Sequence, residues 1–245
     1  MSRLKGSSML KSGKGADFKI TCNGQAFDVH SLIICPRSDY FTGASEAGFK
    51  VSFAKKAFQD ILTIWAHKET GSHTIDLPEM DPLLVGKTLE YLYTLDYFDG
   101  IADSMEGFDQ GLLSEDFDDY LEQQTQDRPA VIKMHVDMIT TADFLGIKSL
   151  QWMAFHKFES ALEAWRPNDN RIIVSLIRHV FTNATSSLCP QRATMLHSLS
   201  HARLFALLKL PEFKELMNDC PEFAFELVEY SLEVLPRMQG KAFSW

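Results

Sequence analysis

The four cysteines are the residues of this sequence best suited to metal binding or redox chemistry. They stand at Cys22, Cys35, Cys189 and Cys220. A zinc site or a redox pair usually needs two thiolates close together in sequence, as in Cys-x-x-Cys, and no two of these cysteines have that spacing. We therefore expect reduced thiols in a reducing compartment, with neither a disulfide framework nor a metal site.

The histidines and glycines also fail to complete a catalytic pattern. His197 and His201 are four residues apart, but Ser198 stands where the zinc-protease pattern requires glutamate. The run from Gly13 to Gly15 suggests a phosphate-binding loop, yet Ser8 occupies the position of that loop's first glycine. The sequence thus predicts no catalytic, cofactor-binding or metal-binding residue, and we expect no enzyme activity.

Composition narrows the class of partner. The chain has 245 residues, 45% of them hydrophobic, and a formal net charge of -9. Non-specific nucleic-acid binding depends on clustered Lys and Arg, so this charge argues against nucleic acid as a direct partner. The sequence has no apolar segment after Met1 and no run of apolar residues long enough to span a bilayer. We expect an intracellular protein without a membrane partner, in the cytoplasm or the nucleus.

The stretch from Asp17 to Lys50 predicts the local structure around which the chain is organised. Apolar and polar residues alternate from Phe18 to Cys22, Asn23-Gly24 fits a tight hairpin turn, and Ala26 to Val29 forms a returning strand. After His30 the apolar spacing becomes helical. A single histidine at such a junction is expected to be a structural hydrogen bonder.

These features, with several downstream motifs, resemble the BTB/POZ domain, especially that of fungal BTB proteins. The resemblance covers residues 16–165 with two interruptions. The matching motifs are Asp17, Asn23-Gly24, Phe27-x-Val29-His30, Cys35-Pro36-Arg37-Ser38-x-Tyr40-Phe41, Gly48-Phe49-Lys50, Ile75-Asp76-Leu77-Pro78, Asp81-Pro82 and Leu89-x-Tyr91-Leu92-Tyr93-Thr94-x-Asp96-Tyr97.

The resemblance implies an α+β architecture, the BTB/POZ fold, in which a small sheet with a hairpin is flanked by a cluster of helices. It also implies dimerisation through the first helices, here residues 32–47. In some members a basic residue after the histidine pairs with the first aspartate, but here Ser31 takes that position, so Asp17 is expected to lack its ionic partner. The candidate residues of the dimer interface are Leu32, Ile33, Tyr40 and Phe41.

The first interruption is the insert at residues 51–68. Its apolar spacing fits an amphipathic helix packed on the domain. A competing hypothesis is a retained intron, because every Val51 codon begins with GT and a Lys68 codon can end with AG. Joining Lys50 to Glu69 would restore an ordinary BTB segment. In BTB adaptors of cullin-type ubiquitin ligases this loop contacts the cullin, so the resemblance makes Phe49, Lys50 and Glu69 candidate partner-binding residues.

The second interruption, residues 96–128, is rich in Asp and Glu and has no Lys or Arg before Arg128. Self-repulsion predicts an extended, solvated loop, either a tolerated insertion or a docking segment for a basic partner. Helical spacing returns between residues 129 and 165, where Val131, His135 and Met138 are expected to share a face.

The remaining segments complete the predicted organisation. Residues 1–15 are rich in Ser, Gly and Lys and are expected to form a flexible arm. A polar turn follows Trp165, and residues 166–245 are expected to form an all-helical region, with one helix over roughly 190–210. Within that region Pro211 and Pro221 each fit a helix start.

The function that these observations favour is protein-protein interaction through a dimerising scaffold or adaptor that needs no cofactor. One alternative is a substrate adaptor of a cullin-type ubiquitin ligase. Another is a transcription-linked scaffold without a DNA-binding module of its own. The partner is therefore expected to be a protein: a second copy, a cullin scaffold or another chain.

Overall fold

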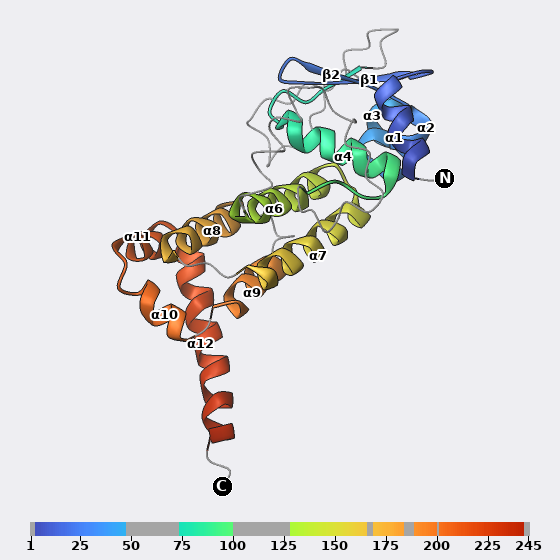
Figure 1. The fold of residues 1–245 in the computed structure, drawn as a ribbon. Coiled ribbons are helices and arrows are strands. Elements are labelled where there is room, and N and C mark those ends of the chain that lie inside the picture. The colour runs from blue at the N-terminus through green and yellow to red at the C-terminus, as the bar shows by residue number, and fades with distance from the viewer. Residues whose placement is uncertain are drawn as a thin grey trace. The chain divides into compact units, whose positions relative to one another are not determined.

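The computed structural model describes residues 3–47, 74–99, 128–165, 169–183, 189–199 and 201–242 (Figure 1). Contacts divide the chain into two compact units, Met1–Ala154 and Phe155–Trp245. The division falls inside one helix, so it does not coincide with the polar turn after Trp165. The described residues form a mixed α+β structure, with a small sheet near the N-terminus followed by a mainly helical region.

The sheet of the first unit has three strands in the order β2-β1-β3. Strands β1 (Phe18–Cys22) and β2 (Gln25–Val29) are antiparallel, and Phe18 faces Val29 in their register. Asn23 and Gly24 connect them with φ values of 46° and 84°, which confirms the predicted hairpin turn. Strand β3 (Thr74–Asp76) pairs in parallel with β1.

Helices surround this sheet in sequence order. They are α1 (Arg3–Ser12), α2 (Ser31–Ile34), the 3-10 helix η1 (Cys35–Arg37), α3 (Asp39–Ala47), α4 (Pro82–Thr94), α6 (Arg128–Phe144) and α7 (Lys148–Ala164), which crosses the division between the units. Asp81 caps α4 by accepting a hydrogen bond from the backbone of Leu83, and Pro82 occupies the first turn, as the sequence predicts. The core of this unit includes Ile20, Val29, Ile34, Ile75, Leu89, Leu92, Val136 and Ile139.

The prediction of a flexible arm is wrong for residues 3–12, which form α1 and pack on α4. Gly6 permits the close approach, because a Cβ at this position would lie 2.2 Å from the carbonyl oxygen of Tyr93. The sequence gave little sign of this helix, since glycine and serine are weak helix formers and the segment has few apolar residues. Packing on α4 therefore decides its conformation.

His30 has the structural role that the sequence predicts. The Tyr93 hydroxyl accepts a hydrogen bond from the His30 backbone N–H at 2.8 Å and lies 2.7 Å from its Nδ1, while Nε2 lies 3.1 Å from the Lys14 carbonyl oxygen. A neutral imidazole with its proton on Nε2 satisfies all three contacts, since the hydroxyl then donates to Nδ1. The histidine ties the segment after α1 to α4.

The second unit is helical in its described part. Its further helices are α8 (Asn170–Thr182), α9 (Cys189–His197), α10 (His201–Leu207), α11 (Pro211–Asp219) and α12 (Pro221–Ala242). Pro211 and Pro221 begin helices, which confirms that prediction. Arg192 links α8 to α12, because its guanidinium donates to the Phe181 carbonyl oxygen and to the Glu226 carboxylate. No helix in the described ranges is long and apolar enough to cross a membrane.

The predicted single helix over 190–210 is wrong, because the structure has two helices, α9 and α10, in this range. Ser198 stands just after α9, and its hydroxyl donates a hydrogen bond to the carbonyl oxygen of Met195 at 2.6 Å. A serine side chain that binds nearby backbone competes with the helical hydrogen bonds, which favours a turn. Apolar spacing alone does not reveal this interruption.

Candidate functional site

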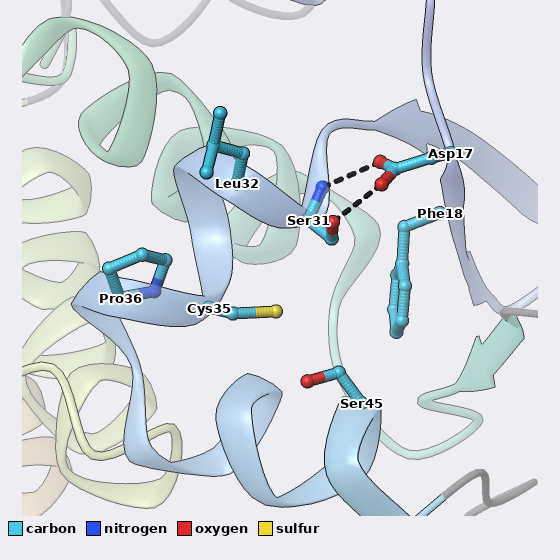
Figure 2. A pocket seen from close by; sticks show the side chains of 7 residues that line it. All are labelled: Asp17, Phe18, Ser31, Leu32, Cys35, Pro36 and Ser45. Carbon is cyan, nitrogen blue, oxygen red and sulfur yellow. Dashed lines mark hydrogen bonds between the residues drawn. The ribbon is translucent and has the colours of Figure 1, made fainter.

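A surface pocket lies where the start of β1 meets α2, η1 and α3 (Figure 2). Its volume is about 340 Å³. The lining residues are Asp17, Phe18, Ser31, Leu32, Cys35, Pro36 and Ser45. One wall is polar, formed by the Asp17 carboxylate and Ser31, and the rest is mainly apolar. The pocket thus belongs to the segment that the resemblance assigns to dimerisation.

Asp17 and Ser31 are paired directly across this pocket (Figure 2). Ser31 donates its backbone N–H to Oδ1 of Asp17 at 2.7 Å and its hydroxyl to Oδ2 at 2.5 Å. The side chain of His30, which precedes α2, makes no capping bond, so Asp17 satisfies an N–H of the first turn of α2 from the neighbouring strand. Asp17 lacks the family's basic partner, as expected, but Ser31 holds both of its oxygens.

These bonds explain the acidity of Asp17. The hydroxyl of Ser31, and then its backbone N–H, lower the pKa of Asp17 from its ordinary value of 3.8. A hydrogen bond to the charged carboxylate favours that form over the protonated one. The stabilisation is therefore present above the pKa of the unfolded chain and is lost as the pH falls through the lower pKa of the folded chain.

Replacing Ser31 with alanine should raise the pKa of Asp17 toward its ordinary value, because the alanine variant keeps only the backbone donor. The variant should also lose less stability than the native chain as the pH falls below about 4. Carboxyl NMR titration measures the first effect, and urea unfolding at a series of pH values measures the second. Ser31→Thr keeps the hydroxyl and is the matched control. An unchanged Asp17 pKa in Ser31→Ala would show that the hydroxyl does not set it.

The candidate interface residues differ sharply in exposure. Leu32 is 86% exposed, Ile33 and Tyr40 are partly buried, and Phe41 is 1% exposed. Leu32 can therefore contact a partner directly. Phe41 is instead a core residue, because α3 turns this side chain inward, so the four residues do not form one exposed face.

The candidate cullin-binding residues Phe49, Lys50 and Glu69 lie outside the described residues. The same holds for the insert at 51–68 and for residues 100–127 of the acidic stretch.

The cysteines lie apart in the described part of the chain. Cys22 is buried in β1, and burial, followed by the charges of Asp81 and Asp76, raises the pKa of its thiol to about 11. The thiol donates a hydrogen bond to the carbonyl oxygen of Met80 at 2.9 Å. Cys35 lines the pocket. Within the described ranges, no group of three or more His, Cys, Asp or Glu residues is placed to hold a metal ion.

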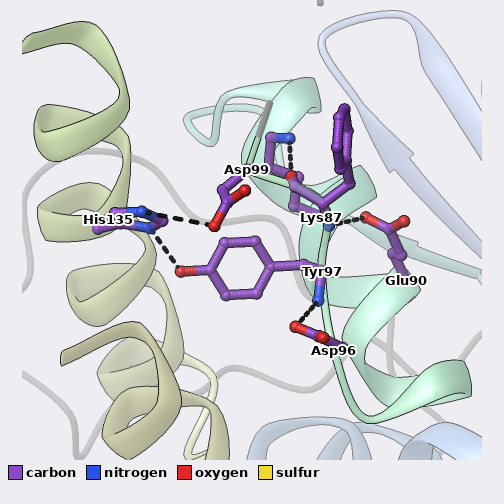
Figure 3. Close-up of polar contacts among 7 residues, drawn as sticks. Lys87, Glu90, Asp96, Tyr97, Asp99 and His135 are labelled. Atoms are coloured by element: carbon purple, nitrogen blue, oxygen red, sulfur yellow. Dashed lines mark hydrogen bonds and ion pairs between the residues drawn. The ribbon is translucent and has the colours of Figure 1, made fainter. Parts of the chain in front are cut away.

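A buried polar cluster joins α4 and α6 to the segment after α4, and the sequence did not predict it (Figure 3). The members of this cluster are Lys87, Glu90, Tyr97, Phe98, Asp99 and His135. All of them are buried. The expectation of a solvated loop from residue 96 onward is therefore wrong for residues 97–99.

The contacts of the cluster hold residues 97–99 against both helices. Lys87 Nζ donates to the Phe98 carbonyl oxygen at 2.6 Å, and the Phe98 N–H donates to the Glu90 carboxylate at 3.1 Å. Tyr97 OH lies 2.7 Å from Nδ1 of His135, whose Nε2 lies 4.0 Å from the Asp99 carboxylate. Burial, and then the charges of Asp99 and Asp96, raise the pKa of Tyr97, so its hydroxyl stays protonated and can donate to Nδ1.

The cluster fixes the chain after α4 rather than presenting groups to a ligand. Its polar groups pair with one another and with backbone atoms, as buried polar groups must. A neutral His135 would carry its proton on Nε2 and direct it at Asp99, which is the arrangement of a structural hydrogen-bond chain. The pocket beside α2 is therefore the better candidate for partner binding.

Comparison with protein-family models and with curated proteins returned no match to this chain.

Proposed function

We propose that residues 16–165 form a BTB/POZ domain and that this chain is a protein-protein interaction module. In this proposal the first partner is a second copy of the chain, and the contact surface is the α2 face, which we define as Leu32 and the pocket around Asp17, Ser31, Cys35 and Pro36.

The arrangement of the first unit supports the proposal. The hairpin, the short helices after His30 and the parallel strand β3 follow one another in the order that the matching motifs occupy in the sequence. Arg37, from the Cys-Pro-Arg-Ser motif, donates a hydrogen bond to the carbonyl oxygen of Leu92 in α4. Ser38 of the same motif donates to the carbonyl oxygen of Leu145 at 2.6 Å. The motif residues thus join α3 to two distant parts of the unit.

The exposure of Leu32 is the observation that carries the dimer proposal. An 86% exposed leucine gains little in a monomer, whereas burying a leucine side chain is worth about 1.5–3 kcal/mol. In a two-fold dimer the same contact occurs twice, because both copies present the same surface. An apolar anchor beside a pocket is also the arrangement typical of interface hot spots.

The test is the solution mass of the full chain by sedimentation equilibrium. We expect a dimer at micromolar concentration, and we expect Leu32→Asp to weaken this dimer at least about 100-fold, because each copy would bring a charge into an apolar contact. Leu208→Asp is the matched control, since Leu208 is an exposed leucine of the second unit. It should leave the contact at the α2 face unchanged.

Two results would contradict the proposal. A native chain that stays monomeric at micromolar concentration excludes a dimer of useful affinity. A dimer contact that survives Leu32→Asp with unchanged strength, measured in a chain without any second contact surface, excludes the α2 face.

A further inference from the structure

Helix α12 carries a row of exposed apolar side chains that the second unit does not cover. Phe225, Val228 and Leu232 are 64%, 54% and 67% exposed. Spacings of three and four residues place them on one face of the helix, which we call the outer stripe. Phe223 and Leu227 are buried, so the helix already uses a different apolar face to pack within its own unit.

The length and position of α12 make the outer stripe accessible. The helix has 22 residues, which corresponds to about 33 Å. Its second half extends beyond the other helices of the second unit (Figure 1). Pro236 lies in this half and removes one backbone hydrogen bond, which weakens the helix there. Most helices in proteins gain their stability by packing an apolar face, so this half would gain from a partner helix.

The charges of α12 indicate which partner fits. The first half carries Glu222, Glu226, Glu229 and Glu233, whereas the residues after Glu233 include Arg237 and Lys241 and no acid. Two such helices side by side in parallel would place like charges together. In antiparallel orientation each acidic half lies beside a basic half, so the sequence of α12 is complementary to itself.

We propose that α12 pairs in antiparallel orientation with α12 of a second copy of this chain. A register centred on Tyr230 sets Val228 of each copy against Leu232 of the other. The same register brings position 237 of one copy beside position 223 of the other, next to Glu222. This contact is separate from the α2 face. Two different two-fold contacts on one chain build a closed tetramer or an open row of dimers.

The test is sedimentation equilibrium of the full chain carrying Leu32→Asp, which removes the proposed contact at the α2 face. We expect this variant to remain a reversible dimer at micromolar concentration. Adding Val228→Glu and Leu232→Glu should weaken the dimer at least about 100-fold, because two apolar side chains per copy lose their burial. Both positions are exposed, so thermal unfolding of the monomer should stay within about 0.5 kcal/mol of the parent and exclude misfolding.

A charge exchange tests the orientation. Arg237→Glu should weaken the Leu32→Asp dimer by about tenfold, because the two symmetry-related contacts become repulsive. Adding Glu222→Arg should restore the affinity, since each pair again has opposite charges. Failure of this restoration would overturn the antiparallel arrangement.

The failure of each proposal has its own signature. A monomeric Leu32→Asp chain would overturn the α12 contact, whatever the native chain does. A chain with native Leu32 that carries Val228→Glu and Leu232→Glu reports on the α2 face alone, and its dimerisation would support the proposed function independently. If that chain is monomeric while the Leu32→Asp chain is dimeric, α12 pairs and the α2 face does not.

Discussion

Replacing Phe41 with alanine should lower the free energy of unfolding by about 3–5 kcal/mol. The side chain is 1% exposed on α3, and its ring packs edge-to-face against Tyr40 with centroids 5.6 Å apart. Alanine would remove the buried apolar area and leave a cavity that the short helices around it fill only in part. Urea unfolding of the full chain measures the loss as a lower midpoint with an unchanged slope.

The matched control is Leu32→Ala, which truncates a leucine on the neighbouring helix α2. Because Leu32 is exposed, this variant should stay within about 0.5 kcal/mol of the native chain in the monomer. Both substitutions are best measured in a chain that carries the α12 charges Val228→Glu and Leu232→Glu and at low protein concentration, since dimerisation adds stability by mass action. Equal losses for the two variants would contradict the division into a core residue and a surface residue.

This contrast marks how far the sequence reaches at the pocket. Local spacing identified the segment, the hairpin turn at Asn23-Gly24 and the helical character after His30. It did not separate Leu32 from Phe41, because both are apolar residues in short helices of about one or two turns. A helical period needs several turns to define a buried face, and here the packing of α3 against the rest of the unit decides which side chain turns inward.

The pairing of Asp17 with Ser31 was hidden for a different reason. The resemblance implies a basic residue at position 31, and serine has no charge, so a lost partner was the natural expectation. A serine at the first position of a helix nevertheless offers two donors, its hydroxyl and its backbone N–H. Their convergence on one carboxylate depends on the approach of β1 to α2, which is a property of the tertiary structure.

The buried polar cluster shows the limit of composition as a guide. A stretch rich in acids predicts a solvated loop when its charges have no partners. Lys87 and Glu90 supply partners from α4, where a charged residue within an apolar helix has no local signature of burial. His135 was correctly expected on the apolar face of its helix, but its position opposite Tyr97 follows from the packing of α6 on α4.

Replacing Lys87 with methionine should lower the free energy of unfolding by about 3–5 kcal/mol. Lys87 and Glu90 are 1% and 2% exposed, and they bind the carbonyl oxygen and the N–H of Phe98. Methionine fills a similar volume, so the loss would come from the missing donor and from a buried Glu90 carboxylate without the neighbouring positive charge. Urea unfolding measures the loss, and amide hydrogen exchange at Phe98 reports whether the segment after α4 opens.

The double variant Lys87→Met, Glu90→Gln separates charge from packing. Glutamine keeps an acceptor for the Phe98 N–H and carries no charge, so the double variant should recover about half of the stability that Lys87→Met loses, because removing both charges of a buried pair costs far less than removing one. Glu90→Gln alone leaves the Lys87 ammonium buried beside a neutral amide and should also destabilise the chain. If the two single losses simply add in the double variant, the charges of Lys87 and Glu90 act independently, and the contribution of Lys87 reduces to its hydrogen bond with the Phe98 carbonyl oxygen.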